Sequence, residues 1–141
     1  METGQVHYDP VEAFSHIASV GAAPLVVMAN PASGMREITD VEAQARRAGQ
    51  LNFGSGGPAS IGHIYGELMK KDIGINLIHL PYRGCAPMTT DLISGVIPIG
   101  IDVVTASMPI FKSGQLIPLA ASSAKRTPLL PDVPSISELN M

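Results

Sequence analysis

The chain has 141 residues, of which 45% are hydrophobic and 15% are charged. A chain of this length is one domain, with or without attached pieces of another. Its composition is sufficient for a packed core and excludes a disordered chain. The formal net charge is -3, the pI is near 5.7, aromatic residues make up 4% and Trp is absent. The sequence therefore offers neither the basic field nor the stacking side chains that nucleic-acid binding requires.

The single cysteine, Cys85, cannot form an internal disulfide, and no Cys and His spacing matches a metal site. We expect no metal and no cofactor. No run of eighteen apolar residues predicts a membrane span. The first residues lack the basic and apolar regions of a signal peptide. Because both ends read like mid-protein sequence, we expect a piece of a longer protein.

Short apolar runs alternate with segments of helical periodicity. Expected strands cover 24–29, 51–53, 75–80, 96–101 and 116–121. Expected helices cover 35–48, 60–71, 85–94 and 105–113. The continuous apolar run at 24–29 is typical of a strand buried on both faces, whereas Pro98 favours an edge or distorted position for the fourth strand. The alternation predicts an α/β fold with a largely parallel sheet.

The two ends of the chain contain no complete βα unit. Residues 8–17 and 127–139 carry turn residues and scattered apolar side chains, and three prolines make the second segment extended or turn-like. We expect both segments to pack on a domain that this sequence does not contain.

The glycine loop, residues 54–60, joins the second strand to the second helix and reads Gly-Ser-Gly-Gly-Pro-Ala-Ser. It matches neither the P-loop nor the dinucleotide fingerprint. One interpretation is a tight connection in which glycines only turn the chain. The other is an anion cradle at a helix N-terminus. Its candidate ligand contacts are Ser55 and the N–H groups of Gly56, Gly57 and Ala59, and Ser60 is the helix N-cap or a ligand contact.

Two further candidates follow the neighbouring strands. Tyr82 and Arg83 lie in the turn after the third strand, and Asp102 ends the fourth. Strand ends of a parallel sheet meet at one edge, where open α/β sheets bind their ligands. The alternatives stay open: Arg83 is a solvated charge or a ligand contact, and Asp102 caps the helix near Thr105 or binds a ligand amine or water.

The histidines of this region do not predict a catalytic site. His63, in the first turn of the second helix, faces a ligand or is a partly buried histidine bonded to backbone. His79, within a strand, is expected to be structural, and Cys85 is expected to fill space. The spacing of a nucleophile with its base and orienting carboxylate is absent, so an enzyme using His63 or Asp102 as an acid–base group is a minor hypothesis.

Taken in order, these segments resemble the tripartite tricarboxylate transporter receptors, also called the Bug family of periplasmic solute-binding proteins. The resemblance covers nearly the whole chain. The matching segments are 8–14, 25–27 with Asn30 and Pro31, 51–55, His63 with 66–68, 79–84, 86–87 with 91–92, 113–116, 119–126 and 130–138.

The resemblance implies a three-layer lobe with a mostly parallel central sheet, like that of type II periplasmic binding proteins. It implies a non-catalytic receptor, about twice this length, that closes two lobes around a small carboxylate-bearing solute and hands it to a membrane permease. This chain would be mainly the second lobe, with 24–121 as the lobe, 1–23 as a crossover segment and 122–141 leading back to the first lobe. The glycine loop, residues 81–84 and Asp102 would meet the solute, an organic acid or amino acid.

Two positions depart from the family pattern. Ala59 stands where a second glycine is usual, and Gly62 where an apolar residue is common. Alanine resists positive φ, so we expect the shape of the loop and its ligand contacts to differ here. The alternative function is an effector-sensing domain of a transcriptional regulator with the same two-lobed architecture. Apolar surface on the end segments makes self-association a further expectation.

Overall fold

A computed structural model describes residues 8–9, 12–15, 17–18 and 21–139. Five strands and four α-helices alternate in it, as the sequence predicts. The strands are β1 (Leu25–Ala29), β2 (Leu51–Ser55), β3 (Leu77–Pro81), β4 (Ile99–Val103) and β5 (Ile117–Ala121). The α-helices are α1 (Ile38–Ala48), α2 (Ile61–Ile73), α3 (Cys85–Ile93) and α4 (Val104–Lys112), and short 3-10 helices cover η1 (Pro31–Ser33) and η2 (Ile136–Leu139).

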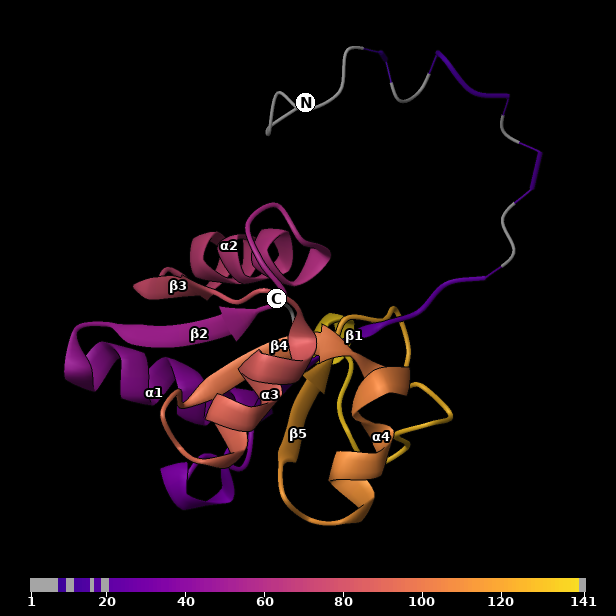
Figure 1. The fold of residues 1–141 in the computed structure, drawn as a ribbon. Helices are drawn as coiled ribbons and strands as arrows, with labels where there is room; N and C mark the ends of the chain where they lie inside the picture. Colours follow the sequence, from indigo (N-terminus) through magenta and orange to yellow (C-terminus); the bar gives the residue numbers. More distant parts are fainter. Residues whose placement is uncertain (1–7, 10–11, 16, 19–20, 140–141) are drawn as a thin grey trace.

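The strands form one sheet in the order β3-β2-β4-β1-β5 (Figure 1). β2 pairs in parallel with both β3 and β4, whereas β1 pairs antiparallel with β4 and β5. Four strands therefore run in one direction, which confirms the mostly parallel sheet. The position expected for the fourth strand was wrong: β4 is central, because Pro98 precedes its first residue, Ile99, and removes no ladder hydrogen bond.

Helices cover both faces of the sheet, which confirms the three-layer α/β lobe. On one face, α1 and α2 pack against a cluster that includes Val27, Phe53 and Leu77. On the other, α3 packs over Met28 and the start of α4 over Val26. Successive β1 residues thus point to opposite, equally buried sides, as the continuous apolar run predicts. Among the described residues, none of the helices is long and apolar enough to cross a membrane.

The C-terminal segment packs on this lobe itself. Leu130 and Val133 are buried against Val26 and Val104, and Ser135 forms a bridge with Ala121. This differs from the expectation that residues 127–139 need a missing domain, because two apolar side chains between the prolines reach the α4 side of the sheet. The expected crossover segment, 1–23, lies partly outside the described residues.

Candidate functional site

Three loops meet where β2, β3 and β4 end. The parallel pairing of β2 with both neighbours places these ends at the same edge of the sheet. The backbone of the glycine loop is tied to residues 81–84, because Tyr82 N donates to Ser55 O (3.2 Å) and Gly84 N donates to Gly56 O (3.1 Å). The structure thus brings together the loops that the sequence singles out.

Ser55, the last residue of β2, is the residue whose side chain bonds to several parts of the glycine loop. Its side chain is fully buried, and its hydroxyl lies 2.7 Å from His79 Nε2 and 3.1 Å from Ser60 Oγ. The same hydroxyl donates to Gly57 O (3.3 Å) and accepts from Gly57 N (3.4 Å). One buried oxygen therefore joins β2, the loop, the start of α2 and β3, and it holds the loop in a fixed shape.

The helix that follows begins at this edge. Ser60 is its N-cap, and Ser60 Oγ accepts a hydrogen bond from His63 N (3.2 Å), which confirms the predicted cap. α2 has 13 residues, so its dipole and its unpaired first-turn N–H groups give this point of the surface a partial positive charge. Such a helix start favours a bound anion.

A hollow of about 320 Å³ lies between these loops. Its lining residues are Ala23, Leu25, Gly56, Ser60, Ile61, Gly62, Cys85, Ile101, Asp102 and Val103. Of the predicted site residues, three therefore line the hollow directly. Ser55, Gly57, Ala59 and His63 shape the loop behind it.

Asp102 and Cys85 share one wall of this hollow. Asp102 is 8% exposed, and its Oδ1 accepts from Val103 N (2.7 Å). Burial, and then the hydrogen bond to the Asp102 carboxylate, raise the pKa of the Cys85 thiol to about 11. The thiol therefore stays protonated at neutral pH and acts as a hydrogen-bond donor, not as a nucleophile.

Tyr82 and Arg83 sit differently. The Tyr82 hydroxyl donates to Asp91 Oδ2 (2.8 Å), and its ring packs with the α3 cluster. Burial, and then this hydrogen bond, raise the pKa of Tyr82. The Tyr82 side chain therefore packs against α3, and its backbone bonds to the glycine loop. Arg83 is exposed.

His63 and His79 form a stacked pair under the glycine loop. Their ring centroids are 3.8 Å apart with an interplanar angle of 11°. His63 Nδ1 accepts a hydrogen bond from Ala59 N (3.1 Å), so this side chain is the backbone-bonded histidine of the two alternatives. Sequence reasoning gave no specific role to His79 or Cys85. The register that pairs Phe53 with His79, and so puts His79 and Ser55 on one face, is what reveals the His79 contact.

Ala59 adopts a positive φ of 57°, alone among the described non-glycine residues. This conformation costs an L-residue with a Cβ about 1–2 kcal/mol. We expect Ala59→Gly to stabilise the chain by about 0.5–1 kcal/mol, since relief of the strain exceeds the extra chain entropy of glycine. Thermal or urea unfolding measures this.

The matched control is Ala43→Gly, an exposed position within α1. There the same change should destabilise by about 1 kcal/mol, since the alanine already has helical geometry. A loss of stability in both variants would contradict the strain at Ala59.

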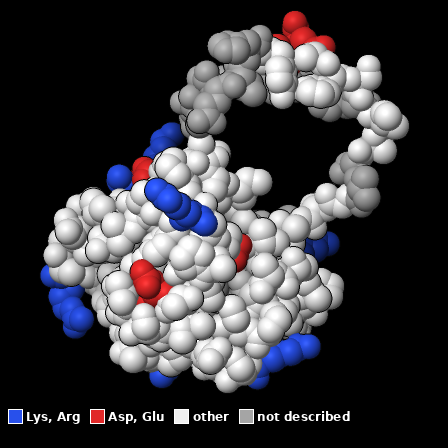
Figure 2. All heavy atoms as spheres, viewed as in Figure 1, with Lys and Arg blue, Asp and Glu red and all other residues white. Residues whose placement is uncertain are grey.

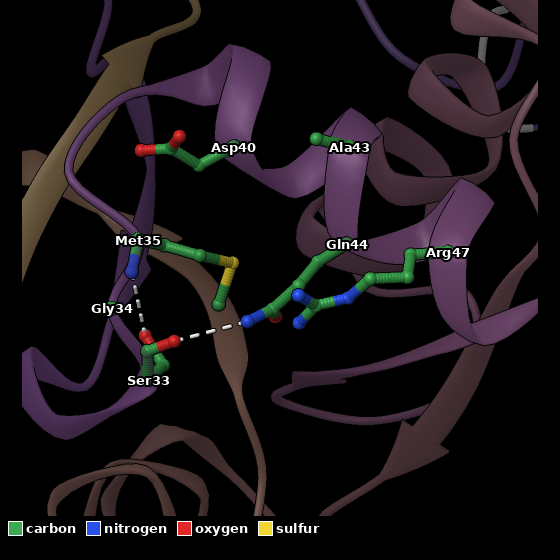
Figure 3. A pocket seen from close by; sticks show the side chains of 7 residues that line it. All are labelled: Ser33, Gly34, Met35, Asp40, Ala43, Gln44 and Arg47. Carbon is green, nitrogen blue, oxygen red and sulfur yellow. Dashed lines mark hydrogen bonds between the residues drawn. The ribbon is translucent and has the colours of Figure 1, made fainter.

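A second hollow, of about 330 Å³, lies at the opposite edge of the sheet (Figure 3). Its residues come after β1 in the chain. β1 ends at Ala29, which pairs with Ile99, the first residue of β4, so this hollow lies at the end of the sheet where β4 begins. Gln44 and Arg47 extend across it from α1, and Gln44 Nε2 donates to Ser33 O (3.0 Å). Asp40 accepts from the N–H groups of Arg36 and Glu37, which lower its pKa. The Asp40 contacts stabilise the N-terminus of α1, so this hollow is a structural feature of the start of that helix.

Neither a metal site nor a basic surface stands out. Among the described residues, no group of three or more His, Cys, Asp and Glu side chains could hold a metal ion. On the face shown in Figure 2, the Lys and Arg side chains are scattered and do not form one patch. The chemistry offered at the candidate site is therefore hydrogen bonding by backbone N–H groups, hydroxyls and one carboxylate.

Known proteins are similar to this chain in sequence. A UPF0065 protein from Bordetella bronchiseptica is 34% identical over 136 residues, which cover 96% of this chain and 40% of that protein. BugT from Bordetella pertussis is 30% identical over 135 residues, covering 95% and 41%. The chain thus spans about 40% of the length of these curated relatives.

Solved structures share the fold. A TctC solute-binding protein from Polaromonas superposes with a TM-score of 0.80 at 24% identity, covering 84% of this chain and 41% of that one. A protein from R. palustris, solved with adipate, has a TM-score of 0.79 at 33% identity, covering 82% and 39%.

These likenesses define the class of fold, which is the α/β fold of part of a periplasmic binding protein. Residues 3–141 match the tripartite tricarboxylate transporter family receptor. The chain belongs to this family, as the resemblance of its motifs implies.

Proposed function

We propose that this chain forms most of the second lobe of a periplasmic receptor, which binds a small carboxylate-bearing solute and delivers it to a membrane permease without catalysis. The observation that carries the proposal is the meeting of the glycine loop with the start of α2 beside a hollow of about 320 Å³. This edge combines loop N–H groups, the Ser60 hydroxyl and the positive end of a helix dipole.

The site residues divide between two kinds of contact. The N–H group of Gly56 and the hydroxyl of Ser60 are proposed to contact a solute carboxylate, directly or through ordered water. The N–H groups of Gly57 and Ala59 and the hydroxyl of Ser55, which are bonded within the loop and to the two histidines, are proposed to hold these contacts in place. Of the other predicted site residues, His63 is proposed to act through its bond to Ala59 and Tyr82 through its backbone at the loop, while Arg83 and Asp102 are proposed as side-chain contacts. Of these, the exposed Arg83 would add positive charge and Asp102 would accept a bond from a solute hydroxyl, amine or water.

The solutes of similar proteins support a carboxylate. The R. palustris relative at 33% identity was solved with adipate. MatC from Rhodopseudomonas palustris, which shares only the fold at 19% identity and a TM-score of 0.77, was solved with malate. A small organic acid or an amino acid is therefore the proposed solute class.

The lobe arrangement is part of the proposal. We propose that residues 24–121 form the lobe, that 1–23 cross over from a first lobe which completes the cleft, and that 122–141 pack on this lobe before leading back to the first one. Closure of two lobes around a solute buries it between them. With one lobe, this chain should bind weakly, and its exposed Phe14 and Ile17 would favour self-association.

Calorimetry with dicarboxylates, tricarboxylates and amino acids tests the proposal on this chain and on the longer reading frame that contains it. We expect a two-lobed protein to bind one of these solutes at least about 100-fold more tightly than the isolated chain. Ser60→Ala in the two-lobed protein should weaken binding. Ser33→Ala, which alters a serine of the opposite edge with backbone contacts of its own, should not.

Sub-micromolar binding by the isolated chain would contradict the need for two lobes. Equal effects of the two serine variants would contradict the placement of the solute. A helix-turn-helix module in the longer reading frame would favour the effector-sensing regulator over the receptor.

A further inference from the structure

The stacked histidines hold the glycine loop at two points. Ala59 N donates to His63 Nδ1 (3.1 Å), and Ser55 Oγ lies 2.7 Å from His79 Nε2. Because both rings bond directly to the loop that the proposed function assigns to the solute, a change in ring protonation acts on that loop without any intermediate element.

The two rings differ in what a proton does to them. Since His63 Nδ1 accepts a hydrogen bond, neutral His63 carries its proton on Nε2, and an added proton must go to Nδ1. That proton turns the acceptor into a donor which faces the N–H of Ala59, and the bond is lost. The hydroxyl of Ser55 can donate to or accept from His79 Nε2, so this contact survives protonation.

The bond that His63 would lose is one that restrains a strained residue. Ala59 has a φ of 57°, and such a conformation persists only where the surrounding contacts enforce it. The Ser60 N to Gly57 O bond, at 3.3 Å, is the next contact along the same turn. Loss of the His63 bond therefore removes the contact made by the Ala59 N–H itself, while the remaining bonds hold the residues on either side of it.

We propose that His63 makes the shape of the glycine loop depend on pH, so that neutral His63 holds Ala59 in its left-handed conformation and a proton on Nδ1 releases it. Where it concerns the solute, this inference rests on the proposed function. The released loop no longer holds Gly56 and Ser60 at the hollow that they line, so affinity for a carboxylate falls as the pH falls.

The charges around the pair favour a response to a single proton. Burial, and then the neighbouring His63, lower the pKa of His79, while Glu67 opposes this. Glu67 follows His63 by one turn of α2 and is paired with Lys70 (3.5 Å). Two rings stacked at 3.8 Å resist carrying two charges. From β2, the uncharged Phe53 and Ser55 face the pair.

Nuclear magnetic resonance on the solute-free 141-residue chain tests the inference. Between about pH 8 and pH 5, the Ala59 amide signal should move with the same midpoint as the His63 ring. In His63→Asn, whose Oδ1 can accept in place of Nδ1 but does not titrate, the Ala59 amide should stay fixed. An Ala59 amide that is silent while His63 titrates, or that still titrates in His63→Asn, would overturn the proposal.

Adipate affinity then connects the loop to the solute. In the two-lobed protein, between about pH 7.5 and pH 5.5, it should fall about tenfold more with His63 present than in the His63→Asn variant, a comparison that removes the titration of adipate itself. In Ala59→Gly, which needs no restraint at this position, the difference should shrink. If adipate binds with the same pH profile in all three proteins, the inference is wrong and the proposed function stands. If no carboxylate binds at any pH, the proposed function fails, while the amide titration still decides the role of His63.

Discussion

Gly66→Ala is expected to destabilise the folded chain by about 2 kcal/mol, the largest effect of any single methyl group that we predict for this protein. A Cβ at this position of α2 would overlap Cε2 and Cζ of the Phe53 ring. Phe53 is fully buried in the middle of β2, so the ring cannot move into solvent. Overpacking of this kind costs about 1–3 kcal/mol or more, and alanine recovers only about 1 kcal/mol of helix propensity. Thermal unfolding should show a fall in Tm of roughly 8 °C.

Two further variants test whether the overlap with Phe53 causes this loss of stability. Phe53→Leu removes the overlapping ring atoms, so the double variant should be more stable than the sum of the single changes by at least about 1 kcal/mol. Gly21→Ala is the control, since a Cβ there meets no atom within 4 Å, and it should stay within about 0.5 kcal/mol of the unaltered chain. Additive effects of Gly66→Ala and Phe53→Leu would show that α2 approaches β2 less closely than described.

Ser55→Ala is expected to cost about 1–3 kcal/mol of stability, because it removes a fully buried hydroxyl and leaves His79 Nε2 without its bond to it. The effect should extend beyond stability. Since the same oxygen contacts Ser60 and Gly57, its loss should free the glycine loop and weaken the proposed carboxylate binding at least about tenfold. Urea unfolding and calorimetry on the two-lobed protein measure the two effects separately.

Ser107→Ala provides the comparison. Ser107 is equally inaccessible at 1% exposed, but its hydroxyl donates to Val103 O (3.2 Å), at the N-cap of its own helix α4, and has no bond to the glycine loop. We expect this change to cost about 1 kcal/mol or less and to leave solute affinity unaltered. Similar losses of affinity in both serine variants would mean that Ser55 acts through general stability and not through the loop.

Local sequence signals predict much of this fold. The glycines after α1 and α2 end these helices in left-handed conformations, and Ser60 caps α2 as its residue type predicts. Pro98 was misread because a proline one residue before a strand and a proline inside it look alike in a sequence. The antiparallel direction of β1 carries no local signal either, since a strand buried on both faces has the same apolar run in either direction.

The candidate site was predicted in outline and missed in detail. Three loops at one edge follow from the order of strands and helices, whereas the contacts among their side chains depend on register. The bond between Ser55 and His79 exists because Phe53 pairs with His79. The bond between Cys85 and Asp102 joins β4 to the start of α3, and nothing in the spacing of these two residues indicates it.

The place of β1 in the sheet has a consequence for how the chain folds. Along the chain β1 precedes the other four strands, but in the sheet it lies between β4 and β5, so Ala29 has both its strand partners only after Ile99 and Ile117 have been synthesised. Only the parallel unit from β2 to β3 can form from sequence neighbours. Closing such long loops is entropically costly and slow. A chain shortened before residue 117 would therefore leave the apolar β1 with an open edge, and aggregation during synthesis is the hazard that this topology carries.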